Sequence, residues 1–197
     1  MISMKIIQSV SDYKFFIHHD RASMGLSGKN LFEEYLKGNT DEVLLYLYLR
    51  SLRRFEYLTN NRKGFMNIPY ILYKHYFKWL RRHTGIYLSP NVFSPGIHLV
   101  HYGYCWVDAS SRIGSNCTIL PRVLLGKKKP GIKPPCIFIG NDCYIGTGVT
   151  ILGPVHIGNN VTIAAGSVVT SDIPDNVIVA GIPAKTIRIK IEKEVDE

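Results

Sequence analysis

Two histidines in the stretch GIHLVHYGYCW, residues 96–106, are the side chains whose type and spacing first point to chemistry. His98 and His101 lie among apolar and aromatic neighbours, and Gly103 follows closely. Imidazole has an unperturbed pKa of about 6.5, so it can serve as a general base, as a metal ligand or as a buried structural group. The stretch by itself leaves these three roles open.

The four cysteines do not add a second chemistry. Cys105, Cys117, Cys136 and Cys143 show no C-x-x-C pair and no zinc-ligand spacing. The start MISMKIIQSV has one lysine and too short an apolar run for a signal peptide, so we expect reduced thiols in the cytoplasm. No run of about 20 uncharged apolar residues occurs, which predicts no transmembrane segment.

Composition predicts a soluble globular protein with an uneven charge. Apolar residues make up 46% of the 197 residues and charged residues 20%. Residues 1–88 hold 14 Lys and Arg against 7 Asp and Glu, whereas the remainder holds 10 against 8. A basic half suits nucleic acid, a membrane surface or a phosphorylated ligand, or forms a solvated helical face. We interpret most of these charges as a solvated face and expect no nucleic-acid partner.

The first 88 residues are predicted to be helical. The predicted segments are LFEEYL after the cap Asn30, DEVLLYLYLRSLRRFEYLTNN after Asn39 or Thr40, and YILYKHYFKWLRRH before Gly85. In the second segment Leu44, Tyr48, Leu52 and Phe55 share one side. We interpret the tyrosines as packing groups. Arg53-Arg54 and Arg81-Arg82 are candidates for an anion site or for a solvated face.

Beyond residue 106 the apolar pattern has a period of six. One row consists of Val107, Ile113, Ile119, Leu125, Ile139, Ile145, Ile151, Ile157, Ile163 and Val169. A second row, four places later, consists of Ser111, Cys117, Val123, Cys143, Val149, Val155, Val161 and Ser167. An α-helix repeats at 3.6, so this pattern predicts a solenoid of short parallel strands stacked about 4.8 Å apart. The Gly and Asn residues of IGSN, IGND and IGNN suit corners with positive φ.

The segment KKKPGIKPPC, residues 127–136, breaks the frame of six. Its prolines and glycine forbid a regular strand, so the chain must leave the solenoid there as a loop. We therefore expect a helical region over 1–88, a β-helix over 89–185 that carries this loop, and a tail over 186–197.

Residues 85–190 resemble the hexapeptide-repeat acyltransferases, whose solenoid is a left-handed parallel β-helix. Among them the chain is most similar to serine acetyltransferase and to related O-acetyltransferases of polysaccharide biosynthesis. Their segment G-x-x-L-x-H is GIHLVH here. The family has a glycine three places after the histidine, and this chain has Tyr104 at that position. The resemblance implies that His101 is the catalytic base and that trimers bind acetyl-CoA between neighbouring β-helices.

We interpret His98 as structural. Related carbonic anhydrases imply a histidine pair five residues apart, which is missing here, so we predict no metal.

The resemblance also implies where acetyl-CoA binds. Similarity to galactoside-type acetyltransferases places Thr147, Ala165 and Thr170 along the cofactor groove, and the small side chains of IAAG let pantetheine approach the backbone. Lys185 and Arg188 resemble that group's cations near the CoA phosphates, for which they are suitable counter-ions. For Ala165, simple corner geometry is an equal alternative.

Departures from serine acetyltransferase decide the predicted acceptor. The family's orienting Asp is Ile86 here, its Asp before the histidine is Val100, and its loop Arg-His pair is replaced by KKKPGIKPPC. This basic loop better suits a hydroxyl of a larger glycan, phosphorylated or lipid-linked. We therefore expect an acetyl-CoA-dependent O-acetyltransferase acting on a saccharide of surface-polysaccharide biosynthesis. Serine O-acetyltransferase is the alternative, and a non-catalytic hexapeptide-repeat scaffold or binding protein is the alternative from another class.

Overall fold

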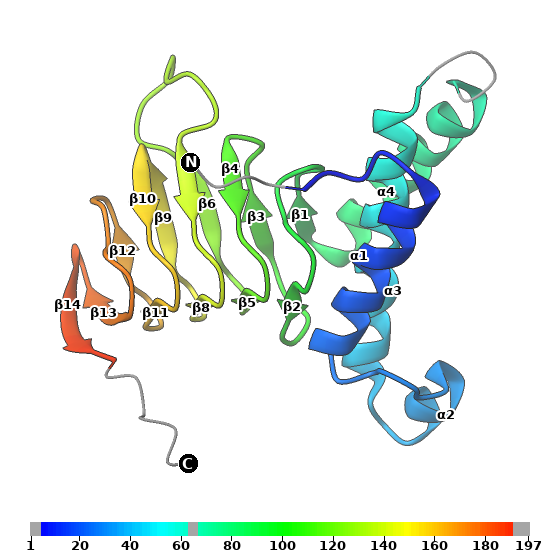
Figure 1. Ribbon diagram of the computed structural model, residues 1–197, viewed down its shortest axis with the longest axis horizontal. Helices are drawn as coiled ribbons and strands as arrows, with labels where there is room; N and C mark the ends of the chain where they lie inside the picture. The colour runs from blue at the N-terminus through cyan, green and yellow to red at the C-terminus, as the bar shows by residue number, and fades with distance from the viewer. Residues whose placement is uncertain (1–4, 63–66, 191–197) are drawn as a thin grey trace.

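The computed structural model describes residues 5–62 and 67–190 of the chain. They form a helical part and a stack of short strands, which lie at opposite ends of the long axis of the molecule (Figure 1). The first strand, β1 (Ile86–Leu88), already pairs with the stack, so the boundary lies close to the predicted one. The predicted tail begins inside the last strand, β14 (Ala184–Ile189), and residues 191–197 of it lie outside the described residues.

Four helices make up the amino-terminal part: α1 (Val10–Ser23), α2 (Leu31–Leu36), α3 (Thr40–Asn60) and α4 (Asn67–Thr84). Asn30 caps α2 as predicted, because its side-chain oxygen accepts a hydrogen bond from the Phe32 amide at 3.0 Å. Helices α3 and α4 cover the two longer predicted segments. Leu44, predicted on the buried side of α3, is instead 39% exposed. None of the helices in the described residues has both the length and the hydropathy needed to cross a bilayer.

Helix α1 is the element that the apolar pattern does not predict. Its buried side chains are Phe16 and Asp20, so no apolar stripe of helical period marks it. Its start does have a sequence signal. The Ser9 hydroxyl accepts from the Asp12 amide at 3.0 Å, and the Asp12 carboxylate accepts from the Ser9 amide at 3.0 Å. This capping box determines where α1 begins.

The strand stack is a three-sided coil. Its remaining strands are β2 (His98–Leu99), β3 (Cys105–Val107), β4 (Ser111–Ile113), β5 (Thr118–Ile119), β6 (Leu124–Lys127), β7 (Ile137–Ile139), β8 (Tyr144–Ile145), β9 (Thr150–Gly153), β10 (Val155–Ile157), β11 (Thr162–Ile163), β12 (Val168–Val169) and β13 (Val177–Gly181). The sheet order is β1-β3-β6-β9-β12 on one side, β10-β7-β4 on the second and β14-β13-β11-β8-β5-β2 on the third. All neighbours pair in parallel except β13 and β14.

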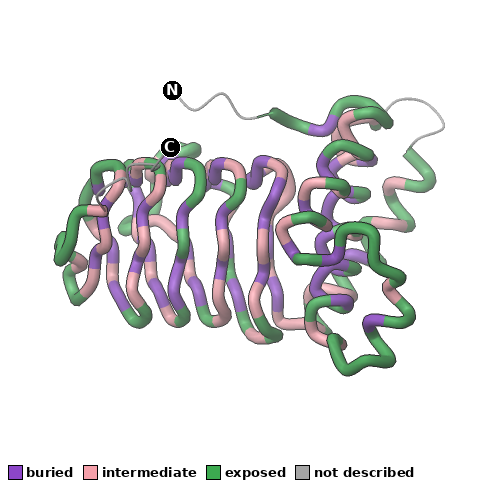
Figure 2. The backbone as a smooth tube through the Cα atoms, turned by 60° about the horizontal axis from the view of Figure 1, so that its bottom comes forward, coloured by how far each residue is buried: buried purple, intermediate pink, exposed green. Residues whose placement is uncertain are grey.

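The period of six is one side of this coil. Tyr144 pairs with Thr162, 18 residues later, so one turn of the coil takes three hexads. All the residues of both predicted rows are buried, and they form the inner wall of the stack (Figure 2). The predicted inward ladder of a parallel solenoid is therefore confirmed.

The corner residues correct one detail of the prediction. Asn116, Asp142 and Asn160 have positive φ, but the glycines of the same corner motifs do not. Those glycines are needed because neighbouring coils approach them closely. A Cβ on Gly140 would lie 2.6 Å from the carbonyl of Gly158 in the next coil. Close backbone contact between coils, rather than backbone conformation, therefore requires glycine at these positions.

The predicted loop leaves the stack between β6 and β7 (Figure 1). Thr118 pairs with Tyr144, 26 residues later, whereas the next turn of the coil takes 18. The loop thus adds eight residues without disturbing the register of the strands on either side. Lys127, the first residue of the predicted loop, still belongs to β6.

A buried ion network joins the helices to the first coil. The side chain of Arg53 in α3 is fully buried, and its guanidinium lies 2.8 Å from the Asp20 carboxylate and 3.1 Å from that of Glu56. It also donates hydrogen bonds to the carbonyl oxygens of Phe93 and Ser94, at 3.0 and 2.9 Å. Burial alone would lower the pKa of Arg53, but the two carboxylates raise it, so the guanidinium stays charged.

The two carboxylates extend the network to the backbone of the coil. Asp20 accepts hydrogen bonds from the amides of Gly96 and Ile97 at 2.8 and 3.1 Å. Glu56 accepts from the amide of Asn91 at 2.8 Å. The amides of Gly96 and Ile97 belong to GIHLVH itself, and that of Asn91 lies five residues before it. The helical part therefore holds the backbone immediately before His101.

Arg53 and Arg54 have different roles, which the sequence pattern does not distinguish. Arg53 is neither part of a solvated face nor open to an external anion, because it is fully buried and paired within the chain. Arg54 is exposed, and its guanidinium lies over the ring of Tyr73 in α4.

Replacing Arg53 with Met is expected to lower the free energy of unfolding by about 3–5 kcal/mol, because Asp20 and Glu56 would remain buried without a counter-ion. Urea denaturation followed by circular dichroism measures this loss. The neighbouring variant Arg54→Met is the matched control and should change the free energy by less than about 0.5 kcal/mol. Similar losses in both variants would contradict the structural role of the network.

Candidate active site

His101 lies at a corner where the first coil is longer than the coils that follow. Eight positions separate His98 in β2 from Trp106 in β3, whereas six separate their register partners Thr118 and Leu124. The two additional residues lie in the turn between β2 and β3, and His101 in that turn is exposed. The hexad repeat is therefore interrupted at the residue that the sequence motif predicts to be catalytic.

The backbone at this corner is strained. Seven described residues other than glycine have positive φ, and five of them are Asn or Asp, which tolerate this region. The other two are His101, at 59°, and Arg122, at 64°. Such a conformation costs about 1–3 kcal/mol and is concentrated at functional sites. The two strained residues are neighbours across coils, because the Arg122 amide donates to the carbonyl of Tyr104.

The turn that carries His101 is the first of a row of equivalent turns. We name this row the His101 corner, and it consists of residues 100–104, 120–123, 146–149 and 164–167. Gly148 donates to the carbonyl of Pro121 at 3.0 Å, and Gly166 donates to that of Thr147 at 2.8 Å. Since coils are about 4.8 Å apart, the row extends about 14 Å from its first turn to its last.

Two of the predicted cofactor residues lie on the His101 corner and one does not. Thr147 and Ala165 are exposed there, and the Thr147 hydroxyl donates to the carbonyl of Pro121 at 2.8 Å. A Cβ added to Gly166 would meet nothing within 4 Å, so the backbone is accessible at that turn. Thr170 follows β12 and lies at the next corner, where Lys128 from the loop donates to its carbonyl.

The two predicted cations both project from β14 and are exposed. Lys185 pairs with Ala180, and the adjacent Gly181 donates to the Ser167 hydroxyl of the His101 corner at 3.2 Å. Arg188 pairs with Ile178, further along β13 and away from that corner. The structure therefore places Lys185 near the far end of the row and Arg188 outside it.

Neighbouring titratable groups have other roles. His98 is half-buried, and burial lowers its pKa although the charge of Glu42 acts in the opposite direction. Cys105 is buried, and burial raises its pKa to about 12, so it remains a thiol at neutral pH. It is therefore not suited to act as a nucleophile beside His101. Within the described ranges, no three or more His, Cys, Asp or Glu residues are grouped as metal ligands.

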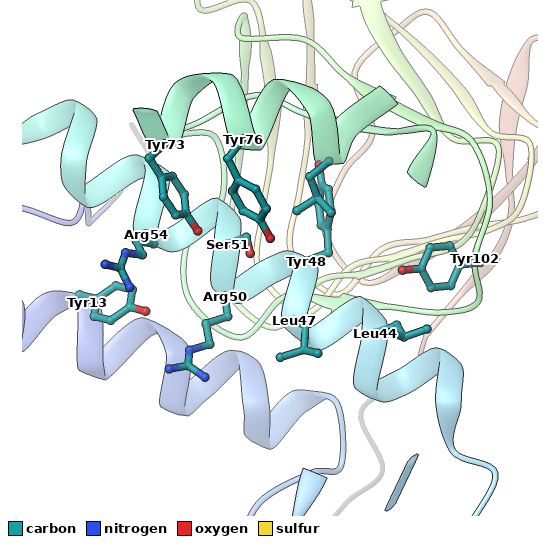
Figure 3. A pocket seen from close by; sticks show the side chains of 11 residues that line it. Tyr13, Leu44, Leu47, Tyr48, Arg50, Ser51, Arg54, Tyr73, Tyr76 and Tyr102 are labelled. Atoms are coloured by element: carbon teal, nitrogen blue, oxygen red, sulfur yellow. The ribbon is translucent and has the colours of Figure 1, made fainter. Parts of the chain in front are cut away.

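A pocket of about 390 Å³ lies beside the His101 turn, between α1, α3, α4 and Tyr102 (Figure 3). We name it the tyrosine pocket; its polar lining groups are Tyr13, Tyr48, Arg50, Ser51, Arg54, Tyr73, Tyr76 and Tyr102. The Tyr102 hydroxyl points into the pocket at one end, and Arg54 lies with Tyr13 at the other (Figure 3). Leu44 is exposed because it also lines this pocket.

The tyrosine pocket has a cationic end. The guanidinium carbon of Arg54 lies 5.6 Å from the centroid of the Tyr73 ring. Over the part of the chain that the structure describes, neither Arg50 nor Arg54 forms a salt bridge. From Leu44 to Arg54 the helix rises about 15 Å, so this end is well separated from Tyr102.

Tyr102, Asp41 and Arg122 are candidate site residues that the sequence does not reveal. Burial raises the pKa of Tyr102, and the negative charge of Asp41, at the start of α3, raises it further. An acid from the helical part therefore acts on the residue next to His101. The two additional residues in the hexad repeat mark the His101 turn in the sequence. No sequence pattern connects this turn with α3, because Asp41 and Tyr102 come together only in the tertiary structure.

Comparison with known proteins supports the predicted hexapeptide repeat. The family described as "Bacterial transferase hexapeptide (six repeats)" matches residues 137–171. A serine acetyltransferase of Synechococcus elongatus is 35% identical over 107 residues, which cover 53% of this chain and 43% of that protein. A serine acetyltransferase of Bacillus subtilis is 33% identical over 131 residues, covering 61% and 59%. A galactoside O-acetyltransferase of Escherichia coli is 41% identical over 91 residues, covering 41% and 45%. The chain spans about half the length of these relatives.

Solved structures show the same fold. A serine acetyltransferase of Neisseria gonorrhoeae has a TM-score of 0.68 at 21% identity, covering 93% of this chain and 67% of that one. A serine acetyltransferase in complex with CoA has a TM-score of 0.66 at 22% identity, covering 90% and 70%.

The chain thus folds as a left-handed parallel β-helix preceded by helices, and the hexapeptide repeat is matched over residues 137–171. The predicted resemblance to hexapeptide-repeat acyltransferases of the serine acetyltransferase type is confirmed.

Arg122→Gly is expected to leave the free energy of unfolding unchanged or to raise it by up to about 1 kcal/mol, because glycine adopts positive φ without strain. Arg122→Ala is the matched control, since it removes the charge but keeps the strain. A glycine variant less stable than the wild type, or an alanine variant as stable as the glycine variant, would contradict the strain at Arg122.

Proposed function

We propose that the chain is an acetyl-CoA-dependent O-acetyltransferase with His101 as its general base. The observation that carries the proposal is the His101 corner, where an exposed histidine on a strained, lengthened turn begins an open row of small and polar residues. The acetyltransferase names of the relatives support the same reaction class.

The reaction needs one proton-transfer group. The His101 imidazole takes the proton of the acceptor hydroxyl while its oxygen attacks the thioester carbonyl carbon. The carbon–sulfur bond then breaks, and the imidazolium returns the proton to the CoA sulfur. The oxyanion that forms between these steps needs an N–H donor at the corner. No acyl-enzyme is required, in agreement with the un-ionised thiol of Cys105.

The donor is proposed to lie along the His101 corner, with its thioester at His101 and its nucleotide toward β14. Thr147 and Ala165 line this path, and Lys185 stands near its far end. Arg188 and Thr170 lie outside this row, so the path does not include them, and their predicted contacts with acetyl-CoA stay predictions. The solved complex of a similar protein with CoA supports this donor.

Serine is the acceptor that the comparisons favour over a saccharide. Two of the relatives are named serine acetyltransferase, and a similar solved structure is a complex with serine. The negative charge of Asp41 raises the pKa of Tyr102, the residue after His101, and a negative charge there would suit an ammonium group. We therefore take serine as the first acceptor to test.

A saccharide that carries a negative charge is the second candidate. The tyrosine pocket favours it, because the pocket reaches about 15 Å from the Tyr102 end to Arg54, well beyond the length of a single amino acid. Its arginines suit a phosphate or carboxylate, and its tyrosines suit the hydroxyls and apolar faces of a sugar ring. The loop, which lacks an Arg-His pair, agrees with this acceptor.

A homotrimer in the cytoplasm completes the proposal. One coil stack supplies one wall of the donor groove, and a neighbouring stack would supply the other. Sedimentation of the active protein tests this assembly, and an active monomer at assay concentration would refute it. A non-catalytic scaffold would release no CoA from acetyl-CoA with any hydroxyl acceptor.

His101→Ala is expected to lower kcat by about 10²–10⁴-fold, because it removes the general base, with little change in the affinity for acetyl-CoA. Stopped assays of CoA release measure kcat, and calorimetry measures donor binding. His98→Ala is the matched control, which should retain most of the turnover. Near-normal turnover by His101→Ala would exclude it as the base.

The two acceptors are distinguished by Arg54→Gln, assayed with serine and with glucose 1-phosphate. If the acceptor is serine, kcat/KM for serine is high and does not change in the variant. If it is an acidic saccharide, glucose 1-phosphate is the better substrate, and its KM rises about tenfold in the variant. CoA release with neither compound would count against both acceptors.

Lys185→Ala is expected to raise the KM for acetyl-CoA about tenfold with little change in kcat, because phosphate binding is uniform between ground and transition states. Exposure of Lys185 to solvent reduces this effect. An acyl donor without the nucleotide should show no difference between the variant and the wild type. Equal losses with both donors would assign the lysine to the fold instead.

A further inference from the structure

The outer face of α4 exposes a row of large apolar side chains. Ile68, Leu72 and Trp79 are 65%, 68% and 52% exposed, and their spacing of four and seven residues places them on one side of the helix. Ile71 flanks this row and is 51% exposed. Scattered apolar residues are normal on a protein surface, but a continuous row on one helix marks an interaction site.

This row does not face the protein interior, because the opposite face of α4 packs against α3. Phe77 is 1% exposed, and its ring stacks on Phe55 of α3 with centroids 4.9 Å apart. Tyr70 stacks on the same ring at 6.0 Å. The inner aromatic face therefore holds α4 against α3, and the outer row stays at the surface.

The same surface is cationic. Lys74, Lys78 and Arg82 follow one another at intervals of four residues, and all three are exposed. The 18 residues of α4 contain no Asp or Glu. Its charge belongs to the larger excess of residues 1–88, where 14 Lys and Arg stand against 7 Asp and Glu.

We propose that the outer face of α4 docks the protein on an anionic lipid surface. A helix with large apolar groups and tryptophan on one side, flanked by lysine and arginine, suits the boundary between headgroups and acyl chains. The apolar row would enter the boundary, while the long cationic side chains stay among the headgroups. The surface would meet the helical end of the molecule, and the coil stack extends away from that end (Figure 1).

The charges argue against the other occupants of this face. A second copy that used the same face would bring two sets of lysines and arginines together without any acid from α4 to pair with them. Nucleic acid would match the charges, but it would leave Ile68 and Leu72 without an apolar partner. An anionic lipid surface satisfies both the charges and the apolar row.

The fluorescence of Trp79 reports directly on lipid binding by this face. The chain has two tryptophans, and Trp106→Phe leaves Trp79 as the only one. In this background we expect a blue shift of the emission when vesicles of phosphatidylglycerol and phosphatidylcholine are added. Vesicles of phosphatidylcholine alone should shift it far less. Co-sedimentation with the same vesicles gives the affinity.

Two variants separate the apolar from the ionic contribution. Ile68→Ser/Leu72→Ser should weaken binding at least tenfold by removing apolar area. Lys74→Gln/Lys78→Gln should weaken it about thirtyfold, at about fivefold per charge, and this loss should shrink at high salt. The matched control is Phe32→Ser/Leu36→Ser, since these residues of α2 are 69% and 68% exposed but lie on another helix. The control should bind as the wild type does.

Each remaining outcome overturns the proposal. No blue shift and no co-sedimentation would exclude lipid docking. A blue shift that appears without vesicles as protein concentration rises, together with a larger sedimenting species, would assign the face to a second copy. An equal loss of binding in the α2 control would mean that any exposed apolar pair, not the face of α4, determines the affinity. None of these readouts depends on acetyl transfer.

Discussion

The buried guanidinium of Arg53 connects the two parts of the molecule. It bonds to carboxylates of α1 and α3 and to two carbonyl oxygens of the first coil, while those carboxylates bond to amides of the same coil. Since a buried charge is stable only when fully paired, this network tolerates little displacement. It holds the segment just before His101 against the helices, so the position of the site depends on a contact that involves none of the reacting groups.

The coil supplies the rigidity that the site requires. From β7 to β12 each turn of the coil takes 18 residues, and the inner wall is packed with aliphatic side chains. Against this regular background, two additional residues and two strained backbones stand out at the His101 corner. A rigid neighbourhood can hold a strained turn that would relax in a flexible loop. The same regularity aligns the turns above it into a row along which an extended ligand can lie.

Helix α4 serves the interior and the surface at once. Its inner aromatic residues pack on α3, and Tyr73 and Tyr76 line the tyrosine pocket beside the His101 turn. Its outer face presents an apolar and cationic row. Placing both on one helix connects the proposed acceptor side of the site with the proposed lipid surface. An acceptor attached to that surface would then approach the pocket from the helical end of the molecule.

The sequence by itself determined the coil, the loop and the candidate base. A period of six is a local property, because each hexad forms one side of the coil and its buried residues recur regardless of distant contacts. The three helices with apolar stripes or caps were predictable for the same reason. Helix α1 was not, since one of its two buried residues is the charged Asp20.

Tertiary structure alone decided the rest. Arg53 and Arg54 are adjacent in sequence, yet one is buried and one lines a pocket, because only the packing of α3 against α1 and the coil distinguishes them. Thr170 likewise lies at a different corner from Thr147, which follows from how the coils stack.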